Sequence, residues 1–322
     1  MPYSGAGMAK ERNKTVDFTV YIVIRLAAAF LRALPFPTAI RFAGVLAWIL
    51  MKISPRRQQI ARNNLHMAFP GQYTPGELDG VVAAMYRHFC MVVVEIIHLD
   101  LLFTLTNWRR HFEFGTPEQY ERFSDAVLGD RPLMIVTGHF GNWELAGYVF
   151  GLIGFSGSAI ARPLDNPHLD RWMRRWREST GQKMIAKNGE FQLIEATLRS
   201  GRVLQTLGDQ DAGQRGLFVP FFHQPASTHK AVALLAMKHK SLIMVMGCAR
   251  IGGGFNYRCT VEDIIDPLAY RKHADASRAI TARFTEGLER LIRQYPEQYL
   301  WIHRRWKHQP KVPKRKPAAV AA

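Results

Sequence analysis

From residue 111 onward, short apolar runs alternate with longer amphipathic segments. A brief apolar run between turn residues is typical of a buried strand, whereas apolar residues spaced by three and four predict a helix. The predicted strands are 111–114, 133–136, 158–161, 203–206, 217–220, 242–247 and 255–261, and the last could run antiparallel. The predicted helices are 117–128, 143–153, 167–181, 190–200, 227–240 and 271–295. This alternation predicts an α/β fold whose mostly parallel central sheet is flanked by helices.

The first hundred residues follow a helical pattern instead. Two apolar stretches, 18–34 and 36–53, each contain two basic residues, and further helices are predicted near 56–67 and 77–105. A spanning helix needs ~20 mostly apolar residues, and a charge at its centre is costly. Both stretches therefore favour helices that associate with a membrane surface, although a span remains open.

The predicted organisation has four parts. Residues 1–14 form a disordered basic N-terminus, 15–106 a helical membrane-associating region, 107–308 the α/β domain, and 309–322 a disordered basic tail. No Gly/Ser-rich linker marks a further boundary in the sequence.

Charge narrows the class of partner. The net charge is +17, which favours acidic partners such as an anionic membrane, an acidic carrier protein or nucleic acid. Aromatic and basic residues do not interleave in a recognition pattern, so a nucleic-acid-binding protein is not expected. The three cysteines are far apart and lack metal-ligand spacing, which indicates a reducing compartment and no metal site.

The segment 137–145 carries the candidate chemistry. It reads as the end of a strand, a glycine-rich turn and a helix start, with Asn142 as the N-cap. His139 lies in the turn and Glu144 in the first helical turn, where the carboxylate could fold back to orient the imidazole. The other ring nitrogen could then take a proton from a substrate hydroxyl, and N–H groups after Gly141 could stabilise developing negative charge. In the alternative interpretation His139 packs or caps, and Glu144 only complements the helix dipole.

Other polar residues follow strands of the same predicted sheet. Ligands of open α/β sheets gather at the carboxyl ends of the strands, where His139, Arg162 and Asp209 should converge. Arg162 suits phosphate binding, or forms a structural ion pair. Asp209 could bind sugar hydroxyls or order its loop. We also count Asn142 as a candidate substrate-binding residue.

Several blocks resemble one family. The heptapeptide 138–144 is similar to the His-x4-Asp/Glu motif of glycerolipid-type acyltransferases, and most resembles the late acyltransferases of lipid A biosynthesis. The further blocks stand in the family's order: 61–65 before 69–70, 161–167, 208–211 with 216–222, and 296–307. Together the blocks cover roughly residues 20 to 307, which is far more specific than a single His–Glu pair.

The resemblance implies an activity. A fatty acyl chain would pass from an acyl thioester, with acyl carrier protein as donor or coenzyme A as the alternative, to a hydroxyl of a lipid A precursor. It implies His139 as general base, Glu144 as its orienting group, no acyl-enzyme, no cofactor and no metal, at the cytoplasmic face of the inner membrane. The family's acidic block often has Glu where this chain has Asp209. An acceptor of the phosphatidylinositol mannoside or ornithine-lipid type is the alternative, and a non-enzymatic membrane scaffold would leave the His–Glu arrangement unexplained.

Two further groups of residues have two interpretations each. Phe218, Phe221 and Phe222 are core residues by default, or the wall of an acyl-chain pocket. The second group consists of the basic segment 303–307 and four arginines of the helix predicted over 167–181. Both are either solvated basic faces or contacts for anionic headgroups or an acidic carrier protein. These arginines are Arg171, Arg174, Arg175 and Arg177.

Overall fold

The computed structural model describes residues 13–310 apart from 156, 188 and 253. Within them, a seven-stranded sheet has the order β1-β9-β8-β2-β5-β3-β4, and each adjacent pair is parallel except β8 with β9. Its strands are β1 Phe112–Phe114, β2 Leu133–Thr137, β3 Ser158–Ala161, β4 Lys183–Ala186, β5 Val203–Leu207, β8 Leu242–Arg250 and β9 Tyr257–Ile265. The α/β class and the antiparallel course of the last strand are confirmed.

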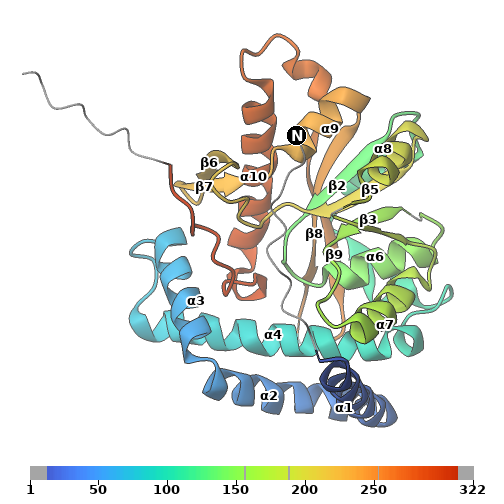
Figure 1. Cartoon of the computed structure of the whole chain (residues 1–322), viewed down its shortest axis with the longest axis vertical. Coiled ribbons are helices and arrows are strands. Elements are labelled where there is room, and N and C mark those ends of the chain that lie inside the picture. The colour runs from blue at the N-terminus through green and yellow to red at the C-terminus, as the bar shows by residue number, and fades with distance from the viewer. Residues whose placement is uncertain (1–12, 156, 188, 253, 311–322) are drawn as a thin grey trace, which may run out of the picture.

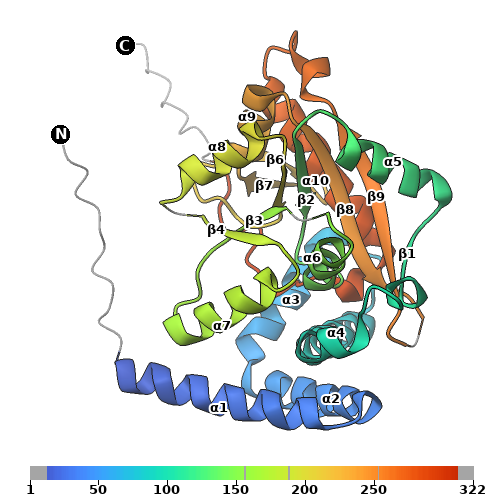
Figure 2. The ribbon, with the colours of Figure 1, turned by 90° about the vertical axis from the view of Figure 1, so that its right-hand side faces the viewer.

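Helices cover both faces of this sheet (Figure 1, Figure 2). Along β2, Met134 and Val136 join one hydrophobic core while Leu133 and Ile135 join another, so the strand is apolar on both faces. One face carries α8 Phe191–Arg199, α9 Ala231–His239 and α10 Ala276–Gln294, and the other carries α5 Pro117–Leu128 and α6 Trp143–Leu152. Helix α7 Pro167–Glu178 packs against α6 and β4. Three short 3-10 helices complete these elements: η1 Trp108–Arg110, η2 Pro267–Tyr270 and η3 Pro296–Gln298.

The N-terminal helices form a layer at one end of the molecule (Figure 1, Figure 2). They are α1 Lys14–Ala33, α2 Phe36–Ile53, α3 Pro55–Ala68 and α4 Pro75–Leu102. Helix α4 lies nearest the sheet, α2 packs along it through Ala39, Ala43 and Ala47, and α1 contacts α4 and α7. By length and composition alone, α2 and α4 could each cross a membrane. Of the most apolar 18-residue stretch of each helix, however, 44% is buried inside the protein in α4 and only 17% in α2.

The outer surfaces of α1 and α2 are apolar. Exposed large hydrophobic side chains on these two helices are Val16, Phe18, Val20, Ile22, Val23, Ile24, Leu26, Phe30, Phe42, Val45, Trp48, Ile49 and Ile53. Both helices lie across the same end of the molecule, opposite α9 (Figure 1). This end therefore presents a wide apolar surface to the surroundings.

Three sequence predictions need correction. The run 217–220 belongs to a separate hairpin, because β6 Leu217–Phe221 pairs antiparallel with β7 Gln224–Thr228. The helix expected from residue 227 begins only at Ala231, because the second hairpin strand continues to Thr228. The helix expected over 271–295 begins at Ala276, where the Asp275 side chain caps it. In addition, strand β4 was not predicted at all. The termini predicted to be disordered lie almost entirely outside the described residues.

Candidate active site

The turn after β2 is built as its sequence predicts. Strand β2 ends at Thr137 and α6 begins at Trp143, with Asn142 Oδ1 accepting the N–H of Leu145 at 2.9 Å. Gly141 has φ +57°, and a Cβ there would collide with the carbonyl oxygen of Cys248. Only glycine fits this close approach. His139 is consequently held on the non-helical part of the turn.

The structure pairs His139 with Asp209. The Nδ1 atom of His139 lies 3.0 Å from Asp209 Oδ1, and its backbone N–H donates to Asp209 Oδ2 at 2.8 Å. Strands β2 and β5 are parallel neighbours, with Thr137 opposite Leu207, so each partner stands two residues beyond a matched position. The imidazole is therefore oriented by a carboxylate from a different strand. The Asp209 side chain is fully buried and holds the His139 turn, which agrees with its predicted role in ordering the loop; binding of sugar hydroxyls stays a prediction.

Electrostatics favour an ionised carboxylate next to a basic imidazole. Burial alone lowers the pKa of His139, but the charge and hydrogen bond of Asp209 outweigh it and raise this pKa above its usual value. Burial would raise the pKa of Asp209, but His139 opposes this and keeps the pKa well below its usual range. Nδ1 is engaged, and no group in the described part of the chain bonds Nε2, which is left available to a substrate.

Glu144 does not orient His139, which corrects the predicted pair. Its carboxylate accepts hydrogen bonds from Arg177 Nε at 2.9 Å and from Trp143 Nε1 at 3.2 Å. Because α6 begins at Trp143, the Glu144 side chain points toward α7, away from the turn. Within the described residues no hydrogen bond joins it to His139, so it acts on that ring only through its charge.

Asn142 is also placed differently from the prediction. Its side chain is fully buried, with Oδ1 used as the N-cap and Nδ2 donating to Glu95 Oε2 at 2.9 Å. Both polar side-chain atoms of Asn142 are thus engaged inside the protein, and its role in substrate binding stays a prediction. The backbone N–H groups of Gly141 and Asn142 donate to Gln298 and Cys248, at 2.9 and 2.8 Å. The Asn142 amide is therefore not available as an oxyanion donor, whereas this role for the amides that follow it at the helix start stays a prediction.

A buried polar network anchors this turn to α4. Glu95, on α4, is fully buried and bonds Asn142, the hydroxyl of Tyr257 and the guanidinium of Arg250. A second α4 residue, His88, donates from Nε2 to the carbonyl of Gly141 at 3.1 Å. The pattern of the sequence gave no sign of this network, because Glu95 lies within the apolar stretch 91–97 of α4.

Arg162 follows β3 at the same edge of the sheet. Its side chain is 75% exposed and bonds Asp165 at 2.8 Å, three residues away. An exposed pair of this kind contributes little to stability, so the guanidinium is free to exchange its partner for an anionic ligand. Phosphate binding by Arg162 stays a prediction.

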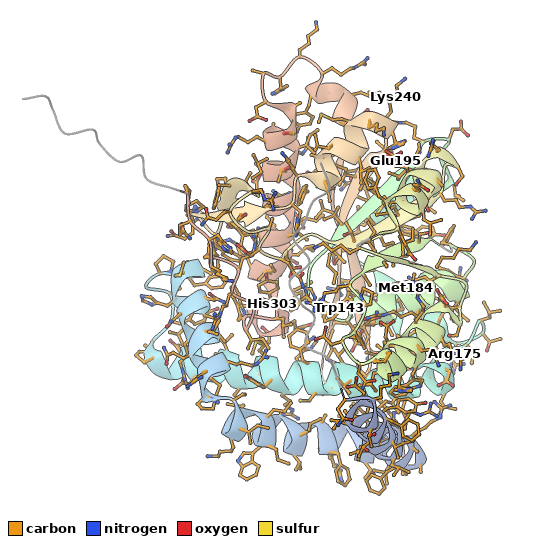
Figure 3. All side chains as sticks on the ribbon, in the orientation of Figure 1. Trp143, Arg175, Met184, Glu195, Lys240 and His303 are labelled. Carbon is orange, nitrogen blue, oxygen red and sulfur yellow. The ribbon has the colours of Figure 1, made fainter. Side chains whose placement is uncertain are left out.

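The C-terminal segment contributes a residue next to the base. The ring centroid of His303 lies 4.6 Å from that of His139, and the Trp143 ring lies 5.1 Å from His139. Trp143 and His303 come close together between the sheet and α4 (Figure 3). Segment 303–307 is not a uniform basic face, because Arg305 and Trp306 are buried.

A partly enclosed cavity adjoins the base. It is lined by Trp143, Glu144, Gly147 and Tyr148 of α6, by Trp176 and Arg177 of α7, and by residues of β2, β3, β4 and β5. Most of this lining is apolar, and Trp143 contacts both the cavity and His139. Of the four arginines predicted on α7, Arg177 thus pairs with Glu144 at the cavity, and Arg174 donates to the carbonyl of Met184.

The phenylalanines of the hairpin do not line this cavity. Phe221 and Phe222 are fully buried and pack with Phe69, Trp301 and Trp306. They are core residues, as the simpler interpretation held. Across the described residues, no group of three or more His, Cys, Asp or Glu side chains is arranged to hold a metal ion.

An imidazole oriented by a buried carboxylate, with Nε2 unbonded and the ring against a tryptophan of an apolar cavity, is the arrangement of a general-base site. The family model for bacterial lipid A biosynthesis acyltransferases matches residues 6–308. The chain is 28% identical to the lipid A biosynthesis palmitoleoyltransferase of Escherichia coli, over 86% of this chain and 87% of the relative. It is 27% identical to the lipid A biosynthesis lauroyltransferase of Escherichia coli, over 88% and 90% of the two chains. It is also 23% identical to a phosphatidylinositol mannoside acyltransferase of Mycobacterium tuberculosis, over 62% and 66%.

This chain belongs to the bacterial lipid A biosynthesis acyltransferase family, and it is an acyltransferase.

Proposed function

We propose that this protein transfers a fatty acyl chain from an acyl thioester to a hydroxyl group of a lipid A precursor, with His139 as the general base. The observation that carries the proposal is the His139–Asp209 pair in a chain of this family, with the His139 ring against Trp143, which lines a largely apolar cavity. Acyl carrier protein is the proposed donor, because an acidic carrier complements a chain with a net charge of +17.

The geometry supports direct transfer. The His139 Nε2 takes the proton of the acceptor hydroxyl as its oxygen attacks the thioester carbon, and Asp209 stabilises the resulting imidazolium. The C–S bond then breaks, and the imidazolium returns the proton to the thiolate. The substrate supplies the nucleophile, so the reaction requires neither an acyl-enzyme nor a cofactor.

The surroundings accommodate the two substrates. The cavity lined by α6, α7 and the strands would hold the acyl chain of the donor, since its walls are largely apolar. Arg162, exposed at the end of β3, would bind a phosphate of either substrate. The acceptor would approach from the membrane side, because the turn bearing His139 is bonded to α4 of the N-terminal layer.

We also propose that α1 and α2 lie in the plane of the bilayer surface. Their exposed side chains form one apolar surface, and both helices lie flat across the same end of the molecule (Figure 2). A helix with an apolar outer face and interspersed arginines suits the headgroup boundary. We assign this surface to the cytoplasmic face of the inner membrane, where a carrier-protein donor would meet a lipid A precursor.

The proposal is tested with purified protein in detergent or vesicles. The wild-type protein should acylate a Kdo-bearing lipid A precursor from a 12- or 16-carbon acyl carrier protein thioester, with the product resolved by mass. His139→Ala should lower this rate by at least a hundredfold while leaving the fold and vesicle binding unchanged. A near-normal rate in the variant would refute the proposed role of His139. If the protein acylated phosphatidylinositol mannoside but not the lipid A precursor, the proposed acceptor would be wrong.

A further inference from the structure

We propose that His303 is a second catalytic imidazole, whose Nδ1–H donates a hydrogen bond to the carbonyl oxygen of the acyl thioester. This inference rests on the proposed function, because it assigns a residue to the same reaction.

The position of His303 is fixed by the surrounding core. Its backbone carbonyl accepts the side-chain amide of Asn64 at 2.7 Å, and the same amide donates to the carbonyl of Trp301. Trp301, two residues earlier, and Arg305, two residues later, are both buried. The imidazole is therefore held against His139, at a ring-centroid distance of 4.6 Å, by a segment without freedom to turn away.

The ring of His303 lacks a hydrogen-bond partner within the described protein. Its Nε2 is enclosed and unpaired, whereas Nδ1 is the ring nitrogen that retains contact with solvent. A polar side chain packed against the base, with neither ring nitrogen bonded, calls for a partner that arrives with the substrate. A proton on Nδ1 keeps the donor at the open side of the ring, where a substrate oxygen can reach it.

His303 stays neutral at physiological pH. Burial, together with the neighbouring charge of His139, lowers the pKa of His303 to about 4. A neutral imidazole can polarise a carbonyl by donating its N–H, and it does not compete with His139 for the substrate proton. The two histidines thus have distinct states: one accepts a proton, and the other only donates a hydrogen bond.

Three backbone amides of the turn are already occupied, so a side-chain donor would add to what the backbone can offer an oxyanion. The N–H groups of His139, Gly141 and Asn142 donate to Asp209, Gln298 and Cys248 respectively. An oxyanion formed at the thioester carbon requires donors about 3 Å away that are aimed at its oxygen. His303 is an uncommitted side-chain donor in contact with the ring of the base.

The step balances without a net proton change at His303. The acceptor oxygen bonds to the thioester carbon, its proton moves to His139 Nε2, and the carbonyl π electrons move to the oxygen. The His303 N–H bonds this oxyanion. The C=O bond then re-forms, the C–S bond breaks, and the thiolate takes the proton from His139.

The test compares three substitutions in full-length protein, with a 12-carbon acyl carrier protein thioester and a Kdo-bearing lipid A precursor as substrates. His303→Ala should lower kcat about a hundredfold with KM for both substrates within about twofold of wild type. His303→Asn, whose amide nitrogen can occupy the place of Nδ1, should have a kcat at least tenfold higher than that of His303→Ala. His303→Gln, which reaches toward the Nε2 position, should resemble the alanine variant.

The matched control is His273→Ala, which removes an exposed histidine between η2 and α10 and should keep the wild-type kcat. Circular dichroism and the midpoint of thermal unfolding establish that each variant is folded. A kcat of His303→Ala within threefold of wild type would overturn the inference and leave the proposed function standing. A rise in KM with unchanged kcat would also overturn it, in favour of ground-state binding, and a wild-type protein without transfer activity would overturn both.

Discussion

Replacing Asp209 by Asn keeps the imidazole of His139 but removes the carboxylate that orients it, and so tests how much catalysis depends on that carboxylate. The Asn side chain can still accept the backbone N–H of His139, a bond of 2.8 Å in the structure. It would then present its NH2 group to Nδ1, where the carboxylate oxygen now lies at 3.0 Å. The imidazole would carry its proton on Nε2, the nitrogen that must accept the proton of the acceptor hydroxyl.

The expected loss is large. An equivalent exchange in a His-carboxylate pair costs about 10⁴ in kcat, and we expect at least about 10³ for Asp209→Asn, which is ~4 kcal/mol of transition-state stabilisation. The pH dependence should change in a defined direction. His139 acts when neutral, so activity falls as the pH drops through its raised pKa. Without the carboxylate that raises this pKa, the acid limb of kcat/KM should shift to lower pH.

The assay is the initial rate of lipid acylation between pH 5 and 9, with the product quantified by mass. Asp209→Glu keeps the carboxylate and should retain more activity than Asp209→Asn. The positional control is Asp211→Asn, because Asp211 bonds His308 rather than His139 and its loss should cost only a few fold. The reasoning fails if Asp209→Asn keeps more than a tenth of kcat, or if the acid limb moves to higher pH.

Three further perturbations test the surroundings of the site. Glu95→Ala leaves the guanidinium of Arg250 buried without its partner, so thermal or denaturant unfolding should show a loss of about 3 kcal/mol in the free energy of unfolding. Trp48→Glu on α2 should weaken binding to anionic vesicles at least about tenfold in a sedimentation assay, whereas Leu234→Glu, exposed on α9 at the opposite end, should not. Ala159→Phe fills part of the cavity, so competition between 12- and 16-carbon donors should shift toward the shorter chain.

Each of these has a contradicting result. Unchanged unfolding of Glu95→Ala would show that the network contributes nothing to stability, and a Glu95→Met, Arg250→Met double variant should be less destabilised than the single one. Equal vesicle binding by the Trp48→Glu and Leu234→Glu variants would show that the membrane-binding surface does not lie on α2. An unchanged chain-length preference for Ala159→Phe, with Ala196→Phe on the exposed side of α8 as control, would place the acyl chain outside the cavity.

The candidate base could be predicted from local sequence, but its immediate partners could not. A strand, a glycine turn and an N-cap are short-range features, and they placed His139 on the turn and Glu144 in the helix as the structure has them. The same short-range view wrongly joined those two side chains. The place of His303 beside the base was not predicted, because its basic neighbours suggested a surface segment, whereas the structure buries Arg305 and Trp306.

The sequence by itself determined the α/β class, the apolar N-terminal helices and the family, because these depend on periodicity and on blocks that can be read along the chain. The tertiary structure alone decided which carboxylate orients the imidazole. A hydrogen bond acts over about 3 Å, and His139 and Asp209 are separated by 70 positions. Only the adjacency and register of β2 and β5 bring them within that distance, while the fold turns Glu144, five residues from His139, toward Arg177 instead.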